Sequence, residues 1–416
     1  MTIRRSALAF IGRASVRAGT ALLLLASAPT SASDDHQPPA APQAVEEPLS
    51  TEAPPASKIT IVRAHLRGEL GHRWVRDIEV WKRDAGRPAV AAQGDFVAYD
   101  RVADHGRRAL FLGRTDGDLE RCLTCDLYEF NDRDVLSPIW HPSGEMIVVL
   151  AQALPTSRRH DALELAGPQR GLHTELWAVD PQGRDAWRLT RARDLGGAVL
   201  DPRFSFEGDR LAWTERVRSG TGGRWGDWQL AWADFEVRRG LPKLDDIERA
   251  DPTPWPGWLA VSSFTPDDGG VFLTGLHRDG RGTSVLRYDF ESAAHVVIGE
   301  IGVDNAHLQP VPRADRQVWA SDGVRDAERD GSHRVGAQDL WLRSTSGARL
   351  ERLTFFSDPA SDAGPARAKD GVRIGGTAWA PDGLSLFVHL VWREAGAAAE
   401  AIYRLRLDPA LVGDAE

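Results

Sequence analysis

The chain has 416 residues, a formal net charge of −9 at pH 7 and 42% hydrophobic residues. This composition fits a globular protein with room for one large repeat domain or two ordinary domains. The first 33 residues carry four arginines and no acidic residue, so their removal would leave a net charge of −13. Such an acidic chain is repelled by nucleic-acid phosphates and anionic lipid headgroups, which argues against a nucleic-acid partner.

The beginning of the chain has the order of a secretory signal peptide. Arginines including Arg4 and Arg5 precede the apolar run Ala18–Ala28, and small residues follow as far as Ser33. We therefore expect residues 1–33 to be removed, a periplasmic or secreted mature protein, and no transmembrane segment in it. A membrane anchor is the competing interpretation, and the paired arginines leave the twin-arginine route open. The following residues 34–57 are rich in Pro, Ala and Glu, which predicts a disordered arm.

A fifteen-residue phrase occurs three times without a gap. Each copy has Leu at place one, an aromatic residue at place two, Gly at place eight, and Leu-Thr at the end. This pattern predicts a strand, a tight turn at the glycine and a second strand. The copies are Leu110–Thr124, Leu176–Thr190 and Leu340–Thr354.

A second phrase alternates with the first. It consists of an aromatic residue, a short turn of the P-D-G, S-G or E-G type, and an apolar run. The aromatic residues are Trp140, Phe204, Phe264 and Trp379. The clear copies are Ser137–Gln152, Asp201–Arg216, Ser262–Gly275 and Gly376–Val391, with weaker ones at Ala89–Asp100 and Gln309–Ser321.

Joined together, the two phrases predict six units of four antiparallel strands, A to D. Repeated radially, such units form an all-β, six-bladed β-propeller, which we place at residues 58–416. The last unit lacks a fourth strand, and Asp77–Lys82, directly before the first unit, can supply it and so close the ring. The predicted blades are 88–124, 137–190, 200–244, 257–299, 305–354 and 375–408 with 77–82.

The alternation of a W-x-P-D-G turn with an L-W-x-x-D-x-x-G-x-x-x-x-R-L-T hairpin resembles the propeller repeat of TolB-like periplasmic proteins. The resemblance covers roughly residues 88–408 and implies a propeller fold that serves as a binding scaffold. The chain departs from TolB itself, because only Lys58–Arg76 is left for the extra N-terminal α/β domain expected there. A direct role in the Tol envelope machinery does not follow.

The longer connections of the predicted propeller all fall between strands B and C or between D and A. Because strand direction alternates within a blade, these connections share one face of the disc, which is typical of a binding face in repeat proteins. Neutral insertion is the competing interpretation. The long connections are Ala153–His173, Val217–Gly226, Asp245–Pro256, Asp322–Ala337, Phe355–Ile374 and Arg393–Ala399.

These connections are rich in Arg and Trp, the residue types that most often anchor protein interfaces. Two of the tryptophans, Trp225 and Trp255, could instead cover the apolar edges of neighbouring blades. The candidate binding residues are Arg158, Arg159, His160, Arg224, Trp225, Trp255, Arg325, Arg329 and His333.

Cys122 and Cys125 are the only cysteines, in a C-x-x-C spacing at the end of the first hairpin phrase. No His follows Cys125, which argues against covalent haem attachment, and two thiolates alone cannot complete a zinc site. A thioredoxin-like motif would open a helix, whereas this one ends a strand. In an oxidising compartment we expect a small structural disulfide.

Catalytic motifs are absent from the sequence: there is no G-x-S-x-G, H-E-x-x-H, EF-hand loop or P-loop. His141 occupies a predicted turn, whereas His307 and His389 lie on predicted strands and could face the central channel. We expect a non-enzymatic propeller without cofactor or metal that binds a protein or cell-wall partner. The alternative is a propeller enzyme, polysaccharide lyase-like or otherwise, that acts on a small molecule in the channel.

Overall fold

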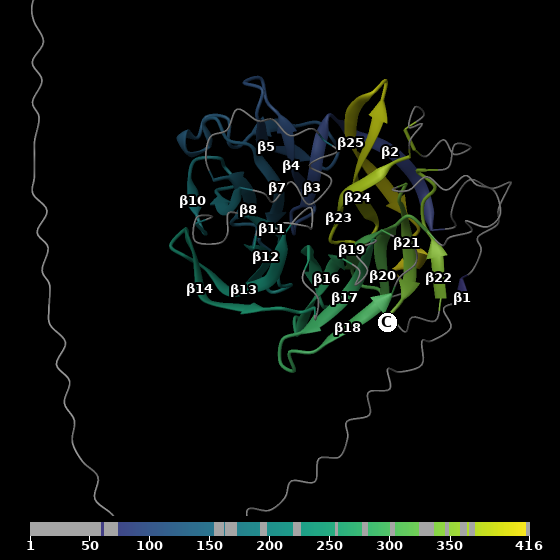
Figure 1. Ribbon diagram of the computed structural model, residues 1–416. Helices are drawn as coiled ribbons and strands as arrows, with labels where there is room; N and C mark the ends of the chain where they lie inside the picture. The colour runs from purple at the N-terminus through teal and green to yellow at the C-terminus, as the bar shows by residue number, and fades with distance from the viewer. Residues whose placement is uncertain are drawn as a thin grey trace, which may run out of the picture. The chain divides into compact units, whose positions relative to one another are not determined.

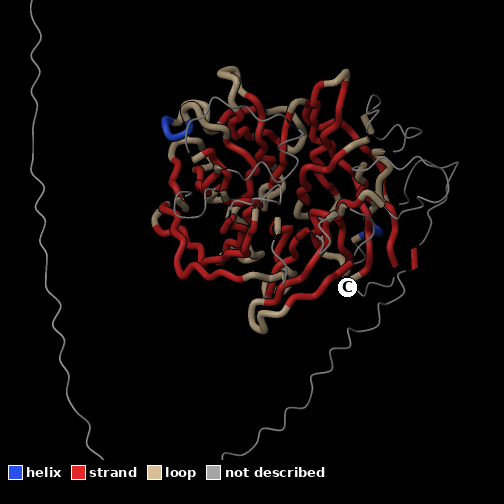
Figure 2. The backbone as a smooth tube through the Cα atoms, viewed as in Figure 1, coloured by secondary structure: helices blue, strands red, loops and turns tan. Residues whose placement is uncertain are grey.

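The computed structural model describes residues 60–61, 74–153, 162, 173–191, 198–218, 226–253, 257–276, 282–299, 304–323, 337–345, 349–357, 364–365 and 371–412. Their strands form six sheets around a common centre (Figure 1, Figure 2). This is the predicted six-bladed, all-β propeller with four antiparallel strands per blade. Within the described residues, no helix is long and apolar enough to cross a bilayer. The predicted signal peptide and arm, residues 1–57, lie outside them.

The first three blades follow the chain in order, and each begins with its innermost strand. The first comprises β3 (Ala85–Val90), β4 (Phe96–Val102), β5 (Arg108–Arg114) and β6 (Glu120–Cys122). The second comprises β7 (Val135–Trp140), β8 (Ile147–Gln152), β9 (Thr174–Val179) and β10 (Ala186–Arg188). The third comprises β11 (Val199–Phe204), β12 (Arg210–Arg218), β13 (Asp227–Arg238) and β14 (Leu241–Ala250). A 3-10 turn, η1 (Tyr128–Phe130), follows the first blade.

The fourth and fifth blades continue in the same way. The fourth comprises β15 (Leu259–Phe264), β16 (Gly270–Leu276), β17 (Thr283–Asp289) and β18 (His295–Gly299). The fifth comprises β19 (Asn305–Pro310), β20 (Arg316–Ser321), β21 (Asp339–Ser344) and β22 (Arg349–Arg352). A short strand from the N-terminal side, β1 (Thr60–Ile61), adds to β22 in parallel.

The sixth blade combines both ends of the folded chain. It comprises β23 (Arg373–Trp379), β24 (Ser385–Glu394), β25 (Ala397–Leu407) and β2 (Val75–Arg83), followed by the 3-10 turn η4 (Pro409–Leu411). β2 pairs antiparallel with β25, so the segment predicted at 77–82 occupies the fourth-strand position. The innermost strand of the first blade, β3, contacts β7 of the second blade and β23 of the sixth.

Strands A and B of every blade are joined by the same turn. In the second blade the N–H of His141 donates to the Met146 carbonyl at 2.9 Å, and the N–H of Gly144 donates to the His141 carbonyl at 2.8 Å. His141 is therefore a turn residue, as predicted. The same pair of hydrogen bonds recurs in the turns that begin at Ala91, Ser205, Thr265, Val311 and Ala380.

One residue of each A–B turn has a left-handed backbone, which favours glycine. Glycine fills this position in four blades and Asp268 (φ 53°) in the fourth, whereas in the fifth blade the left-handed residue is Arg313 (φ 61°), one position earlier in the turn. The Asp268 carboxylate accepts the N–H groups of Phe206, at 2.9 Å, and Glu207 in the turn of the preceding blade. These inter-blade bonds offset the cost of the strained backbone.

The threonine that ends each hairpin phrase has a specific hydrogen-bonding role. Its hydroxyl accepts the N–H of the leucine that begins the phrase, at 2.9 Å for Thr124, 2.8 Å for Thr190 and 2.9 Å for Thr354. The threonines are all buried, so an unpaired N–H at this position could not form a hydrogen bond to water instead. This requirement explains why the phrase keeps Thr at place fifteen.

Replacing Thr190 with valine is expected to lower the free energy of unfolding by about 1–3 kcal/mol. The valine keeps the shape of the side chain but leaves the buried N–H of Leu176 without its acceptor. Urea unfolding of the two proteins measures the difference. The matched control is Thr345→Val at an exposed position after β21, which should change stability by less than about 0.5 kcal/mol. Equal effects of both substitutions would contradict the assigned role.

Two predicted loops are wrong because strands continue through them. β14 pairs with β13 as far as Ala250, so the third blade does not end at residue 244 and much of the predicted loop 245–256 is strand. The predicted loop 393–399 is a tight hairpin between β24 and β25. Its two turn residues, Ala395 and Gly396, both have positive φ (51° and 87°), which matches a two-residue β-hairpin turn.

Candidate functional site

The structure does not test the predicted binding residues, because all of them lie outside the described residues. They belong to the connections between β8 and β9, β12 and β13, β14 and β15, and β20 and β21. The binding face remains a prediction. The residues concerned are Arg158, Arg159, His160, Arg224, Trp225, Trp255, Arg325, Arg329 and His333.

The innermost strands carry the most unusual backbone of the described residues. The pairing of strands A and B shifts register in every blade, as at a β-bulge. Ser137, Asp201 and His307 occupy the shifts in β7, β11 and β19, and all three have left-handed backbones, with φ of 51°, 46° and 57°. Strained polar residues of this kind cluster at functional sites and at tightly held structural points.

In the first and sixth blades a glycine occupies the corresponding position. A Cβ on Gly86 would lie 2.2 Å from the carboxylate Oδ2 of Asp100, and a Cβ on Gly375 would lie 2.2 Å from Nδ1 of His389. Asp100 and His389 belong to the second strands, β4 and β24. The missing side chains therefore let these polar groups fill the space beside the innermost strands.

A buried ion-pair network joins the first and sixth blades. Arg108 at the start of β5 contacts the Asp100 carboxylate at 2.5 Å and also binds the Glu400 carboxylate of β25. Glu400 in turn accepts the Nε2–H of His389 at 3.0 Å. Burial opposes ionisation of Glu400, but Arg108 and His389 outweigh it and lower its pKa to about 2. Burial likewise opposes the charge on Arg108, and the two carboxylates raise its pKa above the usual value.

The same network reaches the second and third blades. The second carboxylate oxygen of Asp100 accepts the backbone N–H groups of Arg87, at 3.1 Å, and Ser137, at 3.2 Å. The Arg87 guanidinium donates to the Asp201 carboxylate at 2.7 Å, which links β3 to β11 past the intervening blade. Four blades are therefore held together by one set of polar contacts near the centre.

The geometry of this network suits a structural tie better than a substrate site. His389 is 2% exposed and Glu400 8% exposed. The cavity beside them, lined also by Arg87, Asp100 and Ser137, has a volume of about 10 Å³, which is room for about one water molecule. His307, the other histidine that could face the channel, is 9% exposed on β19. Among the described residues, no three His, Cys, Asp or Glu side chains are grouped to hold a metal.

His141 lies between the turns of the second and third blades. Its Nε2–H donates to the Gly208 carbonyl at 3.0 Å, and its Nδ1 accepts the N–H of Ser143 at 3.1 Å. The ring also packs against Phe204 and Phe235, with centroids 4.9 and 5.3 Å away. Burial lowers the pKa of His141, although the Gly208 carbonyl opposes this shift. The folded protein thus favours the neutral ring.

Acidification is therefore expected to destabilise the protein through His141. Its folded pKa lies below the unfolded value, so the stability it contributes is present above pH 6.5 and is lost as pH falls through the folded pKa. Urea unfolding at pH 7.5 and at pH 5 measures the free energy of unfolding. Between these pH values it should fall more for the native protein than for His141→Ser. The difference should not exceed about 1 kcal/mol, because solvent screens a half-buried group. Serine stands at the equivalent place in the third blade, Ser205. Identical pH profiles would refute the assignment.

Cys122 and Cys125 are joined by a disulfide with an S–S distance of 2.01 Å. It connects the end of β6 to the segment leading to η1, and both residues are half-buried. Their sulfur atoms lie beside the aromatic cluster that contains Tyr99 and Phe111.

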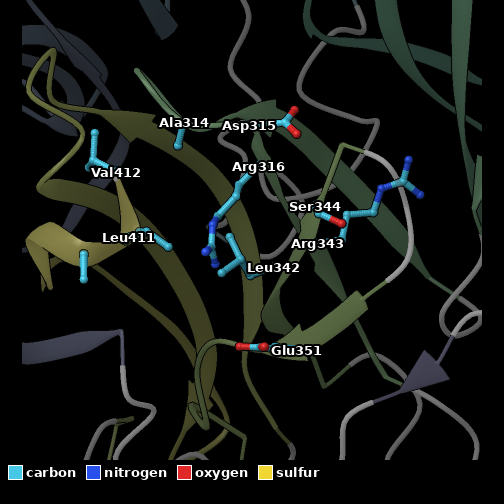
Figure 3. Close-up of a pocket in the computed structure, with 10 residues that line it drawn as sticks. Ala314, Asp315, Arg316, Leu342, Arg343, Ser344, Glu351, Leu411 and Val412 are labelled. Atoms are coloured by element: carbon cyan, nitrogen blue, oxygen red, sulfur yellow. The ribbon is translucent and has the colours of Figure 1, made fainter. Parts of the chain in front are cut away.

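A larger cavity lies between the fifth blade and η4 (Figure 3). Its volume of about 360 Å³ falls in the range of small-ligand pockets, and it is lined by residues of the β19–β20 turn, β20, β21, β22 and η4. The Arg316 guanidinium carbon lies over the Trp74 ring, 4.5 Å from its centroid. The Trp74 Nε1–H donates to the Glu351 carboxylate at 2.9 Å. The Arg343 guanidinium instead donates to Gln317 and to the Ile298 carbonyl. This cavity could not be predicted from the sequence, because its walls come from distant segments.

Comparisons with known proteins describe the fold. No protein-family model matches the chain, and no curated protein matches it. Among solved structures it is similar to TolB from Acinetobacter baumannii, with a TM-score of 0.47 and 16% identity over 76% of this chain and 64% of that one. The match therefore spans less than two thirds of that TolB.

Two further solved structures are also similar to this chain. A gluconolactonase from Xanthomonas campestris has a TM-score of 0.46 and 12% identity over 81% of this chain and 92% of its own. The β-propeller domain of the Trilobed protease from Pyrococcus furiosus has a TM-score of 0.42 and 9% identity over 77% and 79%. At these identities the likeness is one of fold.

Proposed function

We propose that this chain is an exported β-propeller binding protein that holds a protein or cell-envelope partner on its long-connection face. We define this face as the side of the disc that carries the B–C and D–A connections. The observation that supports it most is the one-sided distribution of connection lengths. Connections on the other face are short, as between β5 and β6 (115–119) and between β13 and β14 (239–240).

The long connections lie on the long-connection face, at the other ends of the strands. They include residues 153–173 between β8 and β9, 322–338 between β20 and β21, and 353–372 between β22 and β23. Because paired strands within each blade are antiparallel, the B–C and D–A connections lie on the same face of the disc. The arginines and tryptophans on these connections are the anchors we propose, and the predicted N-terminal signal peptide supports a periplasmic or secreted location.

A loop-replacement experiment tests this function. Residues 154–172 are replaced by a short Gly-Ser link, and native and altered proteins are crosslinked in intact cells and purified. We expect the native protein to carry a defined partner, and the altered protein to lose it while keeping the same melting temperature. The matched control replaces the short 115–119 connection and should keep the partner. A partner retained by the 154–172 variant, or turnover of a substrate with no captured partner, would overturn the proposal.

A further inference from the structure

The disulfide occupies two positions that another blade brings together without a covalent bond. Cys122 pairs with Phe111 in the β5–β6 hairpin, and Arg352 pairs with Trp341 in the β21–β22 hairpin. Cys122 and Arg352 are thus equivalent, since both face the aromatic residue at place two of the phrase. Three residues later the chain has Cys125 in the first blade and Phe355 in the fifth.

In the fifth blade these positions are held by a non-covalent contact. The Arg352 guanidinium lies 4.5 Å from the centre of the Phe355 ring. The threonine hydroxyl bond that closes the hairpin is the same in both blades, 2.9 Å in length for Thr124 and for Thr354. The fifth blade therefore closes its hairpin at this position without a covalent bond. In addition, the loop that this disulfide closes is short, and short loops gain least from crosslinking in the chain-entropy model.

The surroundings of the two sulfur atoms are unequal. The backbone N–H of Cys125 donates to Sγ of Cys122 at 3.0 Å. A hydrogen bond of this kind stabilises negative charge on sulfur, so Cys122 is the better leaving thiolate. Both cysteine residues are partly exposed, as the approach of an attacking thiolate requires. Exchange should therefore proceed by attack at Cys125 and departure of Cys122.

We propose that Cys122–Cys125 is a thiol–disulfide exchange site for a dithiol partner. A thiolate of the partner attacks Sγ of Cys125, the Cys122–Cys125 bond breaks, and its electron pair goes to Sγ of Cys122. The second thiol of the partner, as its thiolate, then attacks the mixed disulfide at the partner's own sulfur and releases Cys125. The partner ends as a disulfide, and this chain ends as a dithiol that has gained two electrons and, once both thiolates are protonated, two protons. This activity is independent of the partner-binding face.

Equilibration with glutathione tests the exchange. The whole protein is incubated in mixtures of reduced and oxidised glutathione, quenched with acid, and analysed by mass spectrometry of its peptides. We expect both the disulfide and the dithiol across the mixtures, and transient glutathione on Cys125 at least tenfold above that on Cys122. A disulfide that stays intact in every mixture, as structural disulfides do, would overturn the proposal, and so would glutathione found chiefly on Cys122.

A stability measurement separates exchange from a structural role. The variant with both Cys122→Ser and Cys125→Ser should melt within a few degrees of the oxidised protein, because the fifth blade closes the same position without sulfur. Thr124→Val serves as the matched control: it removes the hydrogen bond shared by both hairpins and should lower the melting temperature clearly. A double-serine variant that melts as low as Thr124→Val would assign the disulfide a structural role instead.

Discussion

A chain that begins after Arg83, and therefore lacks β2, is expected not to fold. β2 pairs with β25 along its whole length, from Val75 to Arg83. Its Trp81 also bridges two blades, with ring centroids 5.3 Å from Tyr99 of the first blade and 5.4 Å from Phe387 of the sixth. The indole Nε1–H donates to the Thr115 carbonyl at 3.1 Å. The free energy lost with these contacts should exceed the free energy of unfolding of a typical domain, which is about 5–15 kcal/mol.

Circular dichroism and thermal melting of the truncated protein measure this effect. The matched control is a chain that lacks only residues 1–57, the predicted leader and arm, and it should melt like the full chain. Adding a peptide of residues 74–84 to the truncated protein should restore part of the strand signal, because the peptide can pair with β25. A truncated protein with an unchanged melting temperature would show that the ring closes without β2.

Replacing Arg108 with methionine is expected to lower the free energy of unfolding by about 3–5 kcal/mol. Methionine fills a similar volume but leaves the carboxylates of Asp100 and Glu400 buried without the guanidinium. Removing one partner from a buried ion pair is far more costly than the pair itself is stabilising. Urea unfolding at pH 7 measures the loss. At pH 4.5 the deficit should shrink, since protonation of Glu400, which no longer has the guanidinium beside it, removes part of the buried charge.

Arg114→Met is the matched control for Arg108→Met. Arg114 lies at the other end of β5 and pairs with Asp116 at 3.0 Å, but its side chain is 52% exposed. Exposed ion pairs contribute about 0–1 kcal/mol, so this substitution should have a small effect. Equal losses for the two variants would mean that the buried network does not hold the first and sixth blades together.

The repeating parts of the fold could be predicted from the sequence because local chemistry specifies them. The left-handed backbone of the turns favours glycine, and the recurrent threonine supplies a hydroxyl for a buried N–H. β2 was predictable because the sixth unit ends one strand short. β14 was predicted too short, because its segment LPKLDDIERA is largely exposed and charged and shows no clear apolar alternation.

The central network could not be predicted, because its members are far apart in the sequence. Arg108 and Glu400 are separated by 292 positions, and each would be taken for a solvated surface residue on its own. The only local signs are glycines such as Gly375 on the innermost strands, which make room for polar side chains from the second strands. The proposed binding residues stay a prediction, because they lie on connections that the repeat does not specify and outside the described residues.

Photo-crosslinking in intact cells tests the central claim, partner binding on the long-connection face, most directly. A photoreactive amino acid is placed at His160 or His333 in the long connections, and at Ser143 or Asp382 in the short turns of the opposite face. Binding on the long-connection face predicts one defined adduct from the first two positions and none from the second two. Adducts of equal yield from both faces, or from the short turns alone, would contradict it.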